Sequence, residues 1–276
     1  MAISRAGPDL GIQLSSLGSG SPDRLLDAAA AAGFRGVGLS SMETAEWMDA
    51  GLSSRALRRK LEDRNLRADY LDPLVIWLGG VEPSFDSLKE DQVVALGAEL
   101  DVPRINVTLA GPYDRSEAAN AFGRLAERIS AMGIIPMIEF APFFGVSNLE
   151  RAADVIRDAG IVSAGILLDA WHLARSGGKP RDIEHLPSGC IQAVHLSDAS
   201  AEPQQDLIME TMTGRLFPGE GIAQVSEIIH RVQAHSPRAI FTLEVYSPSL
   251  HGADPENFAR RCHEMASSAF LDAETL

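Results

Sequence analysis

The chain contains 276 residues, 45% of them hydrophobic, and carries a formal net charge of −14 at pH 7. This length suits a single α/β barrel of about 250 residues, and no apolar run reaches the roughly 18 residues of a membrane span. The acidic balance argues against a nucleic-acid partner, because a duplex-binding protein needs basic residues to displace counterions from phosphates.

Short β-like runs alternate with helical runs along the whole chain. The first strand is expected at residues 11–15, and Ser21 then caps a helix that has Pro22 at its first position and ends at Gly33. Further strands are expected at 36–40, 67–71, 104–108, 134–139, 164–169, 191–195 and 239–244. Further helices are expected at 53–63, 86–100, 116–132, 148–158, 222–234 and 254–270.

These strand–helix units predict a single domain over residues 1–276. Strands that alternate with helices pair in parallel through right-handed crossovers. Eight such units can close into a (β/α)8 TIM barrel, and a doubly wound open sheet is the alternative. The barrel is favoured because no glycine-rich phosphate fingerprint follows the first strand.

Potential metal ligands end the last four predicted strands. Glu139, Asp169, His195 and Glu244 each follow an apolar run, and barrel chemistry takes place at the C-terminal ends of the strands. Three carboxylates and one imidazole suit an octahedral Mn²⁺, Mg²⁺ or Co²⁺ ion with positions open for substrate oxygens. One such residue could merely cap its strand, but four consecutive strands that end in this way predict one metal site.

Three further residues, His172, Arg215 and Trp171, are predicted to lie at the substrate. His172 follows Asp169 closely and is expected to contact the substrate or to support the ligands, because the ligand set is already complete. Arg215 precedes a tight Pro-Gly turn after the seventh strand, where barrels often bind anionic groups, and its guanidinium can donate to paired oxygens. Aromatic side chains that flank the ligands are expected to wall the pocket or to pack in the core; these are Trp171, Phe140, Phe143, Phe144 and Tyr246.

Several motifs together resemble the xylose isomerase-like TIM-barrel superfamily, which holds sugar phosphate isomerases/epimerases, ketose 3-epimerases, inosose dehydratases and endonuclease IV. The motifs are Ile138-Glu139, the segment 168–178, Val194-His195-Leu196-Ser197-Asp198, Arg215 with Pro218-Gly219-Glu220-Gly221, and Leu243-Glu244. The resemblance implies that Glu139, Asp169, His195 and Glu244 bind the metal and that His172 and Arg215 contact the substrate.

The resemblance also implies proton abstraction next to a carbonyl through a metal-stabilised enediolate, with Glu139 or Glu244, or both, as ligand and acid/base. The first hypothesis is an isomerase or epimerase of a sugar or keto-polyol. The second is a dehydratase of the 3-dehydroshikimate or inosose type, and the third is a non-catalytic sugar-binding barrel. Two departures narrow the choice. Gly145 replaces the second glutamate of ketose 3-epimerases, and the early-strand histidines of endonuclease IV are absent.

The expected partner is a small polyhydroxylated or keto-acid substrate, with neither nucleic acid nor a membrane involved. Aromatic residues in the loops are compatible with a homodimer. Cys190 and Cys262 do not make a disulfide framework, and no signal peptide is recognisable at the N-terminus. A cytoplasmic location is therefore expected.

Overall fold

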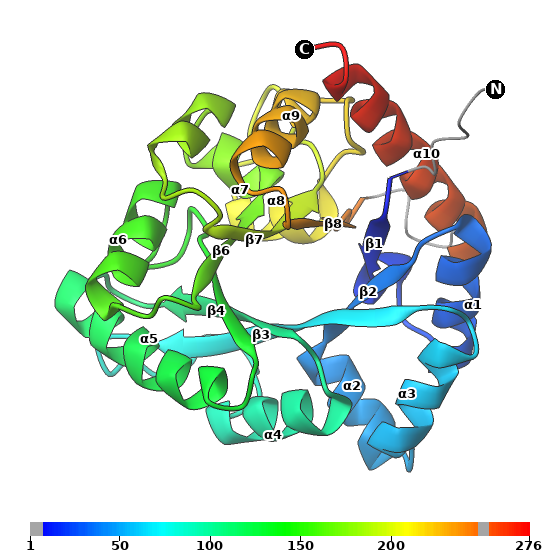
Figure 1. The fold of residues 1–276 in the computed structure, drawn as a ribbon, viewed down its shortest axis with the longest axis horizontal. Coiled ribbons are helices and arrows are strands. Elements are labelled where there is room, and N and C mark those ends of the chain that lie inside the picture. The colour runs from blue at the N-terminus through cyan, green and yellow to red at the C-terminus, as the bar shows by residue number, and fades with distance from the viewer. Residues whose placement is uncertain (1–7, 248–253) are drawn as a thin grey trace.

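The computed structural model describes residues 8–247 and 254–276. Eight parallel strands close into one barrel in sequence order, with β8 paired to β1, and helices surround it (Figure 1). This arrangement confirms the predicted (β/α)8 TIM barrel and excludes the open sheet. Within the described residues, no helix combines the length and apolar character needed to cross a membrane.

The strands lie close to their predicted positions. They are β1 (Leu10–Gln13), β2 (Gly36–Ser40), β3 (Arg67–Trp77), β4 (Arg104–Ala110), β5 (Ile135–Glu139), β6 (Gly165–Asp169), β7 (Ile191–Leu196) and β8 (Ile240–Leu243). The prediction for the third strand was wrong at its end, because β3 continues beyond residue 71 to Trp77. A shift of register between Leu71 and Leu74 takes Pro73 out of the pairing with β4, so proline does not end the strand.

The outer helices are α1 (Pro22–Ala32), α2 (Ser41–Asp49), α3 (Ser54–Glu62), α4 (Glu90–Leu100), α5 (Arg115–Ser130), α6 (Leu149–Ala159), α7 (Ala170–Arg175), α8 (Leu207–Thr213), α9 (Val225–His235) and α10 (Pro255–Ala273). Two 3-10 helices, Leu14–Leu17 and Pro180–His185, complete the described elements. The helices α2, α7 and α8 were not predicted. Each begins close to the end of a strand segment or inside a loop, where a short capped turn leaves little periodic signal.

Helix starts follow the capping chemistry read from the sequence. Ser21 accepts a hydrogen bond from the backbone N–H of Arg24, Pro22 occupies the first turn of α1, and Gly33 ends the helix in the left-handed region with φ of 98°. The cap therefore returns the chain to the barrel directly before β2.

The middle of the barrel is apolar and closed. Tyr70, Met137, Leu167 and Ala193 form a buried cluster between the strands, while a larger apolar layer lies between the strands and the helices. The side chains at the C-terminal ends of the strands therefore lie beside a buried apolar cluster, and charges interact more strongly in such surroundings than in water.

Candidate metal centre

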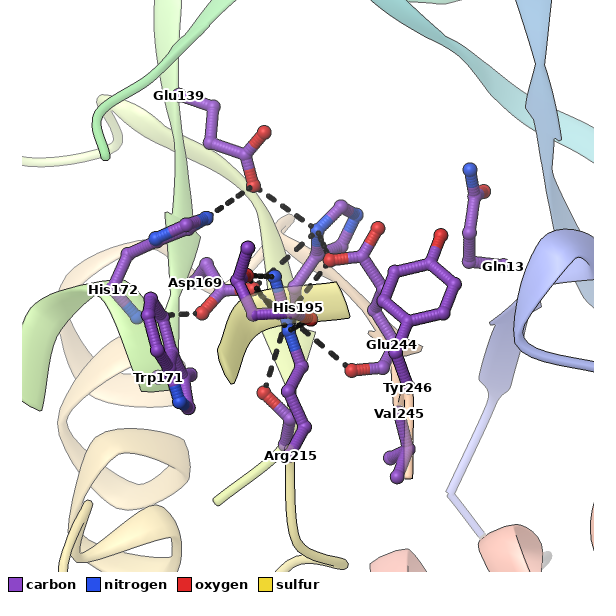
Figure 2. A network of polar contacts seen from close by, with 12 residues as sticks. Gln13, Glu139, Asp169, Trp171, His172, His195, Arg215, Glu244, Val245 and Tyr246 are labelled. Atoms are coloured by element: carbon purple, nitrogen blue, oxygen red, sulfur yellow. Dashed lines mark hydrogen bonds and ion pairs between the residues drawn. The ribbon is translucent and has the colours of Figure 1, made fainter. Parts of the chain in front are cut away.

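Four titratable side chains meet at the C-terminal ends of the last four strands. Glu139 ends β5, Asp169 ends β6, His195 lies near the end of β7, and Glu244 directly follows β8. One ligand atom from each lies within 4.8 Å of the others, and Figure 2 shows the side chains turned toward one another. The structure thus brings together the four residues that were predicted as ligands.

The imidazole of His195 stands at the centre of this cluster. Its Nδ1 lies 3.3 Å from Glu139 Oε1, 3.2 Å from Glu244 Oε2 and 3.9 Å from Asp169 Oδ2. Neither His195 Nδ1 nor Glu139 Oε1 has a hydrogen-bond partner among the described residues, although both atoms are buried. Buried polar atoms without partners are rare, and three carboxylates around one imidazole nitrogen fit a divalent cation.

The far side of the His195 ring is held by β3. Tyr70 Oη lies 2.8 Å from His195 Nε2, and Gly38 leaves room for the phenol, because a Cβ there would lie 2.3 Å from Tyr70 Oη. Burial alone would lower the pKa of His195, but the carboxylates of Glu244 and Glu139 outweigh it and raise that pKa well above its usual value. If Nδ1 bound a cation, the ring proton would be on Nε2, which would then donate to Tyr70.

Arg215 is the cation of the cluster. Its buried guanidinium forms ion pairs with Asp169 and, at 2.8 Å, with Glu244 Oε2, while Thr211 Oγ1 accepts a hydrogen bond from Nη2 at 2.7 Å. Burial alone would raise the pKa of Glu244, but His195 and Arg215 hold it far below its usual range. Arg215 therefore lies beside the four candidate ligands with its charge already paired, and its contact with substrate stays a prediction.

His172 lies on the first turn of α7. Asp169 caps this helix, since its Oδ1 accepts the backbone N–H of His172 at 2.8 Å, and the ring Nε2 lies 4.0 Å from Glu139 Oε1. Burial lowers the pKa of His172, so the imidazole is neutral near pH 7. This position agrees with a residue beside the ligands, and its contact with substrate stays a prediction.

Trp171 is fully buried. Its indole N–H donates to Glu210 Oε1 at 3.2 Å, and its ring lies 5.6 Å from the Arg215 guanidinium. The side chain supports Arg215 from within the protein, and its predicted contact with substrate also remains a prediction. Of the other aromatic candidates, Phe140 belongs to the core, whereas Tyr246 donates to or accepts from Ser15 Oγ at 2.7 Å.

Two polar residues at the site were not assigned a role from the sequence. Asn106 on β4 donates from Nδ2 to Asp72 Oδ1 at 2.6 Å and to Glu139 Oε2 at 2.7 Å. Burial first, and then the charges of Glu139 and Glu244, raise the pKa of Asp72 to about 8. A polar side chain between Ile105 and Val107 in an apolar strand was the one available signal for Asn106.

Comparisons with known proteins agree with this geometry. A family model described as "Xylose isomerase-like TIM barrel" matches residues 26–266. A 3-dehydroshikimate dehydratase from Pseudomonas aeruginosa is 28% identical over 269 residues, which are 93% of this chain and 41% of that protein. A second 3-dehydroshikimate dehydratase, from Pseudomonas putida, is 24% identical with the same coverage. The chain thus spans only about two fifths of the length of these curated relatives.

Solved structures share the fold. A "xylose isomerase-like TIM barrel/4-hydroxyphenylpyruvate dioxygenase fusion protein" superimposes with a TM-score of 0.82 at 20% identity, over 98% of this chain and 44% of that chain. The "IOLI protein with a binding zinc atom" gives 0.78 at 14% identity, over 97% of this chain and 100% of its own. The "probable 3-DHS dehydratase AsbF" from Bacillus anthracis gives 0.74 at 17% identity, over 95% and 99%.

Proposed function

The chain belongs to the xylose isomerase-like TIM-barrel family, and from this premise we propose that it is a divalent-metal-dependent dehydratase of a small polyhydroxylated ketone. The observation that carries the proposal is the convergence of Glu139, Asp169, His195 and Glu244 within 4.8 Å. Dehydration is supported by the curated relatives, both named 3-dehydroshikimate dehydratase. A reducing, cytoplasmic setting is part of the proposal, because Cys190 and Cys262 are both free.

The four residues would hold Mn²⁺, Mg²⁺ or Co²⁺ through three carboxylate oxygens and His195 Nδ1. When bound, such an ion supplies Lewis-acid stabilisation of negative charge on the substrate's carbonyl oxygen. The chain's own contribution is to fix the ligand atoms. Tyr70 sets the His195 ring, and Asn106 sets the Glu139 carboxylate by donating to its Oε2.

Glu139 is the better base of the two glutamates. Arg215 pairs with Glu244 and helps to hold its pKa down, which makes Glu244 a weak proton acceptor. Glu139 has no arginine or lysine partner among the ion pairs of the described residues. In the proposed reaction Glu139 accepts the proton from the carbon next to the carbonyl, and the C–O bond of the β-hydroxyl breaks. The departing oxygen then leaves as water after taking up that proton.

Neutral His172 lies beside the proposed base, Glu139. Its ring lies close to Glu139, and because burial lowers its pKa it acts as a hydrogen-bond donor rather than as a cationic acid. A donor in this place can orient a substrate hydroxyl toward Glu139 without competing for its proton.

Isomerisation or epimerisation is the second candidate. It is favoured by the positions of Glu139 and Glu244, which approach His195 Nδ1 from β5 and from the end of β8 and could address two faces of one carbon. The surroundings of Gly145 argue against a ketose 3-epimerase, which has a glutamate at this position. A Cβ there would lie 2.5 Å from the carbonyl oxygen of Gly111, so the backbone leaves no space for a glutamate.

The test is NMR of the Mg²⁺-loaded protein in D₂O with 3-dehydroshikimate, keto-inositols and ketoses. Loss of water to an unsaturated product is the expected result. Deuterium incorporation without loss of water would replace the dehydratase by the isomerase or epimerase. No reaction with any of these compounds, with Mg²⁺ bound, would show that the substrate belongs to another class, and a non-catalytic sugar-binding barrel would be the alternative.

Two variants test the assignment of the base at saturating Mg²⁺. Glu139→Gln is expected to lower kcat by about 10²- to 10⁴-fold, the usual contribution of a general base. Glu244→Gln serves as the matched variant, because it also removes one ligand carboxylate but spares the proposed base. If Glu139→Gln loses no more kcat than Glu244→Gln, the base has been assigned to the wrong residue.

A further inference from the structure

We infer that the substrate is an uncharged hydroxylated ketone that carries an apolar group, and that it has no ionised carboxylate or phosphate. The inference rests on the proposed function and narrows its substrate class. It has two parts, which depend on the charge of Arg215 and on an aromatic surface beside His172.

The first part concerns charge. Among the described residues, Arg215 is the only arginine or lysine that forms an ion pair with Glu139, Asp169 or Glu244. Its guanidinium is 3% exposed and already pairs with two carboxylates. With a divalent ion present, three carboxylates are balanced by that ion and by Arg215. An anionic substrate group would therefore enter the site without a partner, and burying an unpaired charge is costly.

Two other arginines, Arg175 and Arg151, form contacts with other groups. Arg175 pairs with buried Glu210 and also donates to Ser200. Arg151 donates to the carbonyl of Gly145, and its guanidinium stacks over a tyrosine ring. Among the described residues, neither arginine forms an ion pair with Glu139, Asp169 or Glu244.

The second part concerns an aromatic wall, defined as Trp77, Phe85, Phe143 and Phe144. The rings form a continuous series, with centroids 4.9 Å apart for Trp77 and Phe85, 6.0 Å for Phe85 and Phe144, and 4.7 Å for Phe144 and Phe143. The series comes from two segments of the chain. Trp77 ends β3 and Phe85 lies in the loop that follows it, whereas Phe143 and Phe144 lie in the loop after β5.

The wall reaches the proposed reaction centre. Phe143 meets His172 edge to face at 5.8 Å between centroids, and the His172 ring lies 4.0 Å from Glu139 Oε1. Phe85 is 41% exposed, so the outer end of the wall is open to solvent. A substrate held by the ligands and His172 would place any apolar group against these rings, where burial of that group is favourable.

The two parts separate this chain from an enzyme for a keto acid. 3-Dehydroshikimate carries a carboxylate at neutral pH, and the relatives named for it are 28% and 24% identical to this chain. The elimination chemistry can be shared while the recognised groups differ, because the metal cluster and the aromatic wall are built from different residues.

The test is calorimetric binding to the Mg²⁺-loaded protein of three matched probes: 3-dehydroshikimate, its methyl ester and its benzyl ester. The methyl ester is expected to bind at least about tenfold more tightly than the acid, because the ester removes the unpaired charge. The benzyl ester is expected to gain about tenfold again over the methyl ester, from burial of its ring. Equal or tighter binding of the acid would overturn the first part, and equal binding of the two esters would overturn the second.

Variants test which residues cause the preference for the methyl ester over the acid and the further gain of the benzyl ester. Phe143→Ala should remove most of the benzyl gain and leave the ratio of methyl ester to acid unchanged, whereas Met132→Ala, at an exposed site beyond α5, should change neither. Phe144→Arg should shift the preference toward the acid, because it adds a free cation to the wall. Affinity and product formation are measured separately. The expected order of affinities without any product would therefore contradict the proposed function alone. Turnover with the opposite order would contradict this inference alone.

Discussion

The hydroxyl of Tyr70 and the Nε2 of His195 lie 2.8 Å apart, although 125 residues separate them in the chain. The contact crosses the barrel from β3 to β7. It fixes the rotation of the imidazole, so that Nδ1 faces the carboxylates of Glu139 and Glu244. A cation bound at Nδ1 would leave the ring proton on Nε2, which would then donate to Tyr70.

Replacing Tyr70 by phenylalanine should weaken metal binding by about tenfold or more, as is usual when the partner of a histidine ligand is lost. The ring itself is retained, so the barrel should still fold. The measurement is a Mn²⁺ titration followed by electron paramagnetic resonance. Tyr113→Phe is the control, because no residue in the described part of the chain forms a hydrogen bond with the Tyr113 hydroxyl. An unchanged affinity in Tyr70→Phe would show that the contact does not orient the ligand.

Arg215→Met should destabilise the metal-free protein by about 3 kcal/mol or more, because it leaves Asp169 and Glu244 buried without their cation. Saturating Mg²⁺ should reduce the loss, since the ion neutralises the same carboxylates. Urea unfolding with and without Mg²⁺ measures both values. Arg64→Met, which breaks ion pairs to partly exposed aspartates, should cost under about 1 kcal/mol. Equal losses with and without Mg²⁺ would contradict the charge balance described for the site.

Glu43 should make stability depend on pH. Burial, and then the charge of Glu46, raise the pKa of Glu43 from 4.5 to about 7. The folded-state pKa lies above the unfolded value, so protonated Glu43 contributes to the stability of the folded state. This contribution is fully present below about pH 4.5 and is lost as the pH rises through about 7. Glu43→Gln cannot ionise, so its free energy of unfolding relative to the wild type should rise between about pH 5 and about pH 8. Chemical denaturation at the two pH values measures this change, and the same difference at both would refute the shifted pKa.

Gly145→Ala should destabilise the protein by about 1–3 kcal/mol, the usual cost of overpacking. The added Cβ would lie 2.5 Å from the carbonyl oxygen of Gly111, and backbone cannot move as easily as a side chain. Gly123→Ala is a matched control within α5. Its nearest neighbour would be 3.6 Å away, and alanine should stabilise the helix by about 0.5–1 kcal/mol. Thermal unfolding compares the two, and an undiminished melting temperature in Gly145→Ala would remove the steric reason for glycine.

The meeting of Glu139, Asp169, His195 and Glu244 could be predicted from the sequence, because the fold fixes where the strands end. Parallel strands in a barrel end on one rim, so a polar residue directly after an apolar run must lie there, as Glu139 and Asp169 do. The same rule located His195 near the end of β7. No knowledge of side-chain packing was needed for these positions.

The residues that orient the cluster could not be predicted in the same way. Whether a strand residue points into the barrel depends on register, and register shifts between Val37 and Gly38 and between Leu71 and Leu74 break the simple alternation of faces around Tyr70 and Asp72. The burial of Trp171 was also hidden, because the sequence did not reveal that α7 begins directly after Asp169. In a helix each successive side chain turns by about 100°, which separates Trp171 from His172.

The positions of these groups along the chain also have a consequence for synthesis of the protein. Tyr70 and Asn106, which hold two of the ligands, leave the ribosome well before Glu244, and β8 must insert between β7 and β1 to bring Glu244 into place. A nascent chain therefore has no complete binding site for a cation until its barrel closes. Metal ions in the cell should protect finished molecules from degradation and give no such protection to translation products that stop before β8.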